Sequence, residues 1–397
     1  MMSRIWAGID AGKTHHHCVV MDAEGTKLLS RRVLNDEPEL LTLLADVLAL
    51  SQEVTWCIDI VDGGAMLVLA VLFDHEQQVL YIPGRTVNRA AAGYRGQGKT
   101  DARDALVIAD QARMRYDLHP IRRGNEITTE LKLLVARRAD LVADRTRAIN
   151  RLRGLLSGIF PALERVLELS NKGPLVLLSG YQSPAAIRRS GRGGVEAWLR
   201  ARKVRSAAAL AQAAVEAAGR QHTTVAGEQV TADIVAALAE EVMALNARIE
   251  EIDHRIQTCF ADHELAMFIS SLPGMGPQVG AEFLAATHGD MGAFGSADRL
   301  AGFAGLAPVP RDSGRVSGNL HRPQRYHRRL QRALYLAAFS SLRVSPESRR
   351  FYDRKRAEGK THSQAILALA RRRVNVLWAL IRDRRRYQPP ANAPVAA

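Results

Sequence analysis

The sequence is poor in cysteine and has no long apolar run. Its three cysteines, Cys18, Cys57 and Cys259, lie far apart and form no CxxC pair, so neither a disulfide framework nor a structural zinc site is expected. The longest apolar run, residues 65–73, is much shorter than the roughly 20 residues that cross a bilayer. No basic and apolar leader opens the chain. We therefore expect a protein of the reducing cytoplasm with no membrane partner.

Acidic residues are in the minority. The chain of 397 residues has 41 Asp and Glu against 55 Lys and Arg, a net charge of +14. The excess lies in residues 311–386, which contain 21 Lys and Arg but only 5 Asp and Glu. A concentrated basic segment is typical of proteins that bind polyanions, because Lys and Arg displace counterions from phosphates. Arginine dominates this segment, and its guanidinium fork suits phosphate geometry. We favour a nucleic-acid partner, and hence a nucleoid-associated protein, over a solvated basic surface.

The first 116 residues alternate between strand and helix patterns. Apolar runs predict five strands, at about residues 4–10, 16–21, 27–34, 54–60 and 79–83. Helices are expected at about residues 38–50 and 63–73 and from residue 101. The first three strands can form hairpins, whereas the later strands need helical crossovers, so the sheet is mixed. The predicted fold class is α/β plus α, with a mixed sheet, a long coiled-coil region and a mostly helical C-terminal domain.

Residues 127–260 change to a seven-residue period. Val135, Val142, Ile149 and Leu156 recur in one heptad phase, and similar phases recur between residues 238 and 256. Two long helices with such seams are expected to pack as a coiled-coil pair around a helical insertion, and their apolar stripes favour a homo-oligomer, a dimer or tetramer. The later segment LPGMGP fits a helix-hairpin-helix turn. The expected divisions are residues 1–123, 124–264 and 265–387, followed by a disordered tail at 388–397.

Four acidic residues stand where elements of the predicted sheet domain end or begin. Asp10 ends the first strand, Asp59 ends the fourth, and Asp101 and Asp104 open the last helix on one helical face. Strand ends meet at one sheet edge, so these carboxylates can gather although they are far apart in sequence. Such a cluster needs cations, and oxygen ligands favour Mg²⁺ or Mn²⁺, which can clamp a phosphodiester. Taken singly, each acid is instead a cap or turn residue, with Asp101 a good N-cap. We favour the metal site.

Other residues have weaker signals. The run His15–Cys18 suggests zinc ligands, but neighbouring strand residues point to opposite faces, so we expect strand surface with His15 or His17 near the acids. Arg95 and Lys99 are either phosphate contacts or part of a flexible basic loop. Ser313 lies in a loop with two Ser-Gly steps among arginines, at residues 308–318. Such a serine is ordinarily a turn residue, but basic neighbours suit a nucleophile that attacks a phosphodiester.

Five segments together resemble a known family: GIDAGKTHH, CIDIVDGG, GKTDARDA, LPGMGPQVGAEFLA and LAGFAGLAPVPRDSG. They are similar to the bacterial insertion-sequence transposases of the DEDD type, insertion-sequence family one hundred and ten, whose members are guided by a bridge RNA. The resemblance covers nearly the whole chain in the family's order. It implies a ribonuclease-H/Holliday-resolvase-like domain, a coiled-coil region and a C-terminal transposase domain.

The resemblance also implies an enzyme, a DNA transposase or recombinase that cuts and rejoins strands. Asp10, Asp59, Asp101 and Asp104 would bind Mg²⁺ or Mn²⁺, and Ser313 would form a covalent bond to DNA. Its partners would be donor and target DNA, a structured guide RNA and further copies of the chain. The family's second acid is usually Glu, so Asp59 departs from the pattern by a shorter side chain. The alternatives are a metal-dependent Holliday-junction-type nuclease that uses water, and a non-enzymatic nucleic-acid-binding protein.

Overall fold

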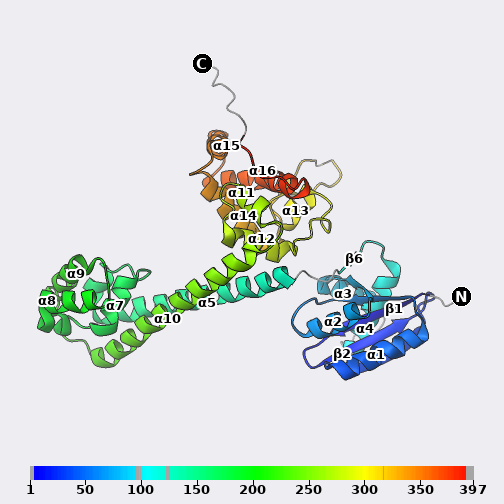
Figure 1. Ribbon diagram of the computed structural model, residues 1–397, viewed down its shortest axis with the longest axis horizontal. Coiled ribbons are helices and arrows are strands. Elements are labelled where there is room, and N and C mark those ends of the chain that lie inside the picture. Colours follow the sequence, from blue (N-terminus) through cyan, green and yellow to red (C-terminus); the bar gives the residue numbers. More distant parts are fainter. Residues whose placement is uncertain (1–3, 95–97, 99, 122–125, 316, 390–397) are drawn as a thin grey trace, which may run out of the picture. The chain divides into compact units, whose positions relative to one another are not determined.

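The computed structural model describes residues 4–94, 98, 100–121, 126–315 and 317–389 (Figure 1). The chain divides into two compact units, Met1–Gly124 and Asn125–Ala397. The first unit is an α/β domain, and the described residues of the second are helical except for one short pair of strands. This confirms the predicted fold class. Of the helices in the described part of the chain, none combines the length and the hydropathy needed to cross a bilayer.

The first unit is built on a six-stranded mixed sheet. Its strands are β1 (Ile5–Ala11), β2 (His15–Met21), β3 (Lys27–Leu34), β4 (Val54–Ile58), β5 (Gln78–Tyr81) and β6 (His119–Pro120), in the order β3-β2-β1-β4-β5-β6. β1, β4 and β5 are parallel, and β2, β3 and β6 pair antiparallel with their neighbours. The five predicted strands are present. β6 was not predicted, because two residues carry no periodic pattern.

Helices cover both faces of this sheet. α1 (Glu37–Leu50), the 3₁₀ turn η1 (Gly63–Ala65) and α2 (Met66–Asp74) pack on the face that carries Ile5, Ala7 and Ile9. α3 (Gly84–Ala91) and α4 (Asp101–Met114) pack on the opposite face, around Cys57. No helix was predicted between residues 83 and 101, where α3 lies, because its Gly84 and two arginines obscured a short helix. α4 lies directly on β1 at Gly8, where an added Cβ would lie 2.8 Å from the Cα of Ala109.

The second unit begins with a long helical hairpin. α5 (Glu126–Ile159) and α10 (Glu228–Ala261) lie side by side in opposite directions, with Arg138 paired to Asp253 and Arg145 bonded to Asn246 at 3.2 Å. Heptad residues such as Leu156 are buried in the core that they share. Between them, α6 (Pro161–Glu164), α7 (Lys172–Gly180), α8 (Pro184–Ala201) and α9 (Ala207–Gly219) form a lobe at the tip of the hairpin (Figure 1). The two long helices and the helical insertion are therefore present, while coiled-coil geometry stays a prediction.

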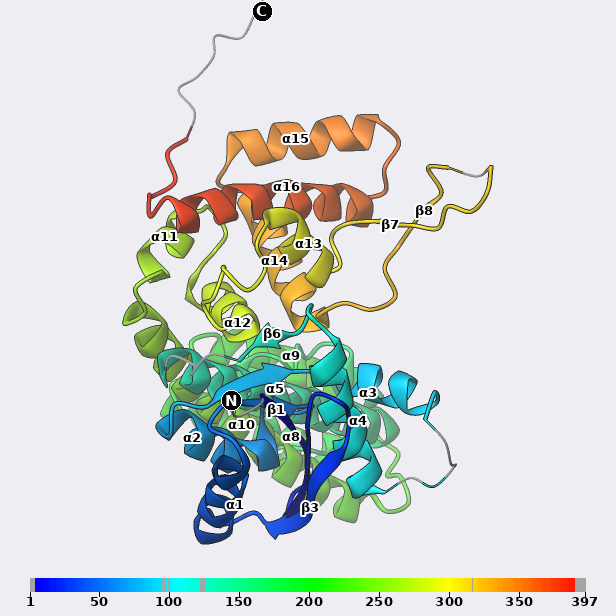
Figure 2. The same ribbon diagram turned by 90° about the vertical axis from the view of Figure 1, so that its right-hand side faces the viewer.

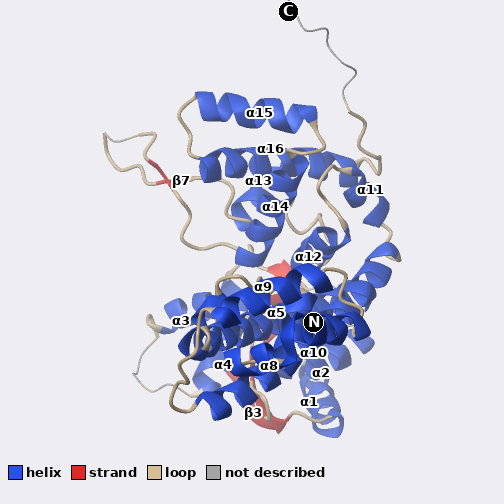
Figure 3. Cartoon of the chain, turned by 90° about the vertical axis from the view of Figure 1, so that its left-hand side faces the viewer, coloured by secondary structure: helices blue, strands red, loops and turns tan. Residues whose placement is uncertain are grey.

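The rest of the second unit is a helical bundle with a projecting arm. Its elements are α11 (Ala266–Ser271), α12 (Pro277–Thr287), α13 (Ala297–Phe303), β7 (Val309–Pro310), β8 (Leu320–His321), α14 (Arg328–Ser341), α15 (Pro346–Ala357) and α16 (His362–Arg382). The LPGMGP turn joins α11 to α12. Its Gly274 has a φ of +82°, and an added Cβ would lie only 3.0 Å from the backbone nitrogen of Ser341 in α14. The glycine thus permits close helix packing. The strands β7 and β8 lie in the arm, outside the bundle (Figures 2 and 3).

Candidate functional site

The register of the sheet places Asp10 and Asp59 at the same edge. β1 and β4 are parallel, and Ile9 pairs with Ile58. The residues that follow this pair are Asp10 and Asp59, which therefore lie next to each other at the ends of the two strands. Parallel neighbours lie about 4.8 Å apart. Side chains alternate along a strand, so Asp10 is on the face of Gly8, which α4 covers. Asp59 follows Cys57 by two residues, and Cys57 belongs to the core beneath α4. Both carboxylates therefore lie on the α4 side of the sheet.

The first turn of α4 brings the other two acids to this edge. Asp101 and Asp104 are both in that turn. The charge of Asp104 helps raise the pKa of Asp59, after the larger effect of burial, whereas the backbone N–H of Ala11 lowers it. Asp101 acts on His17, the partner of Asp10 on β2: burial lowers the pKa of His17, and the carboxylate of Asp101 opposes that shift. The structure thus places Asp104 near Asp59 and Asp101 near His17, at the edge of the sheet where β1 and β4 end.

The acidic edge suits a hard cation. Asp59 Oδ1 is buried and, within the described residues, has no hydrogen-bond partner. A buried carboxylate oxygen without a donor is costly, and the nearby charge of Asp104 adds repulsion. Both costs fall when a divalent cation binds, and all four candidate ligands offer oxygen, which Mg²⁺ and Mn²⁺ prefer. Across the described ranges, no three His, Cys, Asp or Glu side chains are already arranged around one metal position.

Two expectations about this region need correction. Asp101 is not the N-cap of its helix, because the side chain of Thr100 accepts the Arg103 N–H at 3.2 Å. His16 is not strand surface: it is 1% exposed, because helices cover both faces of the sheet. His17 does lie on the acidic face, opposite Asp10. The two candidate phosphate contacts of the basic loop, Arg95 and Lys99, lie outside the described residues.

Ser313 lies on the arm between β7 and β8 and is exposed. The arm is held at its base, where Gly305, with a φ of +69°, faces Tyr326 so closely that an added Cβ would lie 2.7 Å from the tyrosine Cβ. The rings of Phe303 and His327 also meet there, with centroids 5.2 Å apart. Further out, the backbone N–H of Arg311 donates to the Asn319 carbonyl at 2.9 Å. The arm is therefore held at its base and projects from the bundle (Figure 2), and Ser313 is exposed on it.

A basic groove lies on the arm that carries Ser313, beside β7 and β8. It has a volume of about 340 Å³ and is lined by Arg311, His321, Arg322 and Arg325, among others. Arg322 and Arg325 fall within the basic segment 311–386, and the sequence predicted no role for them beyond polyanion binding, although the segment HRPQR held the signal. Guanidinium groups can hold phosphoryl oxygens and stabilise developing negative charge.

Two family models match the chain. A DEDD model described as a transposase matches residues 7–161, and a model described as the transposase IS116/IS110/IS902 family matches residues 266–353. The first match includes all four acids, and the second includes Ser313.

Known proteins are similar to this chain over its full length. The uncharacterized 42 kDa protein of insertion element IS900 from Mycobacterium paratuberculosis is 56% identical, over 100% of both chains. The 44.8 kDa protein of insertion element IS116 from Streptomyces clavuligerus is 52% identical, over 97% of this chain and 96% of its own. A solved structure of RuvC from T. thermophilus with a Holliday junction substrate matches 30% of this chain and 99% of its own, at 19% identity and a TM-score of 0.25. By its full-length relatives, the chain belongs to the IS116/IS110/IS902 family of transposases.

Proposed function

We propose that this DNA transposase uses Asp10, Asp59, Asp101 and Asp104 to hold divalent cations, Mg²⁺ or Mn²⁺, and Ser313 as its nucleophile. The observation that carries the metal site is the buried Oδ1 of Asp59, which has no hydrogen-bond partner in the described part of the chain and lies near the charge of Asp104. Bound there, a divalent cation supplies positive charge that polarises the phosphoryl group. Asp59 is shorter than the usual Glu, and the Ala11 N–H holds its carboxylate at the strand end.

Ser313 and its neighbours supply the covalent step. The serine Oγ attacks the phosphorus of a DNA strand and gives up its proton, so an Oγ–P bond forms. The bond from phosphorus to a deoxyribose oxygen breaks, and that oxygen takes up a proton to leave as a hydroxyl. Arg311, Arg322 and Arg325 hold the non-bridging oxygens. Because the phosphodiester energy is kept in the serine ester, a second strand hydroxyl can reverse the step and rejoin DNA.

The binding partners that we propose follow from this chemistry. DNA binding follows from the transposase family, and residues 311–386 provide the basic surface for it. A structured guide RNA and assembly into a homo-oligomer belong to the proposal. They are supported by the family resemblance and by the long helices α5 and α10.

The test is a search for a covalent adduct. The protein is incubated with Mg²⁺ and labelled DNA from the element's ends, denatured, and digested to map the attached residue. We expect an adduct on Ser313 that is absent in Ser313→Ala and present in Ser317→Ala, a matched serine four residues away on the same arm. Chelator or Asp104→Asn should prevent the adduct while DNA binding remains. Strand cleavage by Ser313→Ala would instead support a nuclease that uses water.

A further inference from the structure

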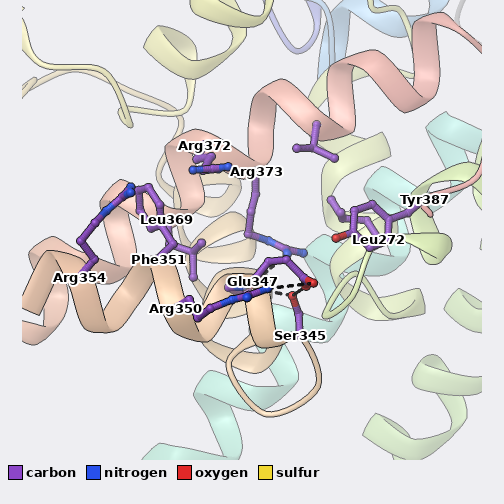
Figure 4. A pocket seen from close by; sticks show the side chains of 12 residues that line it. Leu272, Ser345, Glu347, Arg350, Phe351, Arg354, Leu369, Arg372, Arg373 and Tyr387 are labelled. Carbon is purple, nitrogen blue, oxygen red and sulfur yellow. Dashed lines mark hydrogen bonds and ion pairs between the residues drawn. The ribbon is translucent and has the colours of Figure 1, made fainter. Parts of the chain in front are cut away.

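A second basic groove lies on the C-terminal bundle, built from residues other than those of the serine arm. It has a volume of about 510 Å³ and lies between α15 and α16. Figure 4 shows Arg350 and Arg354 on α15 and Arg372 and Arg373 on α16, with Glu347 as the acid among them. Four guanidinium groups stand against one carboxylate, Glu347, which pairs with Arg350 at 3.6 Å, so the lining keeps an excess of positive charge.

Arg373 is the most unusual of these arginines. It is 8% exposed, and burial lowers its pKa to about 10. Its guanidinium donates to the Pro273 carbonyl of the LPGMGP turn and to the Ser348 hydroxyl at 3.4 Å. Among the described residues, no carboxylate lies within ion-pair distance of it. A buried charge without a counterion is costly, so an anion at the groove floor would be favoured.

Phe351 organises the exposed arginines of the groove. The guanidinium groups of Arg354 and Arg372 each lie 5.1 Å from its ring centroid, and the ammonium of Lys355 lies 5.7 Å away. Cation–π contacts of this kind hold long side chains in place without neutralising their charge. Three cations from two helices therefore lie around one ring, and Glu358 pairs with two of them, Arg354 at 3.8 Å and Lys355 at 2.6 Å.

We propose that this groove binds the phosphodiester backbone of a nucleic acid. A phosphate over Arg373 supplies the missing anion, and neighbouring phosphates lie against Arg350, Arg354 and Arg372. The ligand chemistry is common to DNA and RNA. The groove thereby anchors a strand independently of the covalent chemistry on the serine arm.

The experiment measures affinity against salt concentration in the full-length Ser313→Ala protein, so that no covalent bond contributes. The groove variant is Arg350→Gln with Arg372→Gln, both exposed side chains that are replaceable without opening the core. We expect the slope of log affinity against log salt to become less steep by about 1.8 on duplex DNA, or about 1.4 on a single strand. At 0.15 M salt the slope change on duplex corresponds to an affinity loss of about 30-fold.

The matched control removes the same number of charges, both from α15, at side chains that do not line the groove. Arg349 pairs with Asp353 at 3.0 Å, and Arg356 donates to the Lys360 carbonyl at 2.6 Å. Arg349→Gln with Arg356→Gln should leave most of the slope intact. Equal slope changes in both variants, or no change in the groove variant, would overturn the proposal.

Two further measurements test the proposal. Duplex DNA, single-stranded DNA and single-stranded RNA of equal length separate the sources of the phosphate: a slope change confined to RNA assigns the groove to a guide strand, and one confined to DNA assigns it to donor or target. Phe351→Leu keeps every charge, so its slope should stay constant while affinity falls about two- to five-fold. An unchanged affinity would exclude the aromatic ring from the site.

Discussion

Replacing Gly8 by alanine should damage catalysis although Gly8 carries no chemistry. A Cβ at this position would lie 2.8 Å from the Cα of Ala109, and the backbone of α4 approaches closer still at Ala105. Carbon atoms pack best at about 3.5–4.0 Å, so α4 must move from the sheet by about 1 Å. Overpacking of this kind costs about 1–3 kcal/mol of stability. The same movement displaces Asp101 and Asp104 from Asp10 and Asp59, and a 1 Å misplacement costs about 100-fold in rate.

The assay compares Gly8→Ala with Gly154→Ala. Gly154 lies in the helix α5 with nothing within 4 Å of an added Cβ, so that alanine should stabilise the protein by about 0.5–1 kcal/mol. Denaturant unfolding gives the stability, and single-turnover cleavage of labelled element-end DNA gives the rate. Wild-type stability and rate in Gly8→Ala would refute the idea that the contact between α4 and β1 places the acids.

Four further predictions concern the acids and the arm. Burial and Asp104 raise the pKa of Asp59, so the ionised carboxylate destabilises the metal-free fold at a pH above its folded pKa. Asp59→Asn should therefore stabilise the metal-free fold at pH 7, by an amount that shrinks as the pH falls. Thermal unfolding measured across pH tests this. Mg²⁺ at 100 times its Kd should stabilise the wild type by about 2.7 kcal/mol and Asp59→Asn much less. Gly305→Ala, whose Cβ would press on Tyr326, should lower the adduct yield several-fold at unchanged DNA affinity; equal yields would mean that the arm's base does not position its serine. Mixing Asp10→Asn with Ser313→Ala proteins should restore part of the cleavage that each lacks, measured on the same labelled DNA.

The sheet and its acidic edge were largely predictable from the sequence. Alternating and apolar runs marked five strands, and the order of strands and helices required parallel crossovers that bring Asp10 and Asp59 to one edge. The position of Asp101 and Asp104 followed from helical spacing. These inferences succeed because they depend on local pattern and on the geometry common to all parallel sheets.

What the sequence could not supply depends on tertiary contact. A glycine at position 8 reads as a weak strand residue, and only the folded chain shows that α4 rests on it. Likewise an arginine at 373 reads as surface, since charged side chains are seldom buried, and its place beneath the groove depends on the LPGMGP turn 100 residues away. His16 was misjudged for the same reason: alternation separates two faces, but it does not tell that helices bury both.

The division of the chain gives the mixing experiment its meaning. All four acids lie in the unit of residues 1–124 and Ser313 lies in the unit of residues 125–397, so neither unit alone holds both parts of the proposed chemistry. If the acids and the serine that act together come from different copies, a mixed assembly contains an intact pair, and the two defective proteins complement. If they come from one copy, every chain in the mixture lacks one part, and cleavage stays absent even when both variants fold and associate. Restored cleavage would therefore show a site shared between copies, and its absence would place the complete site within one chain.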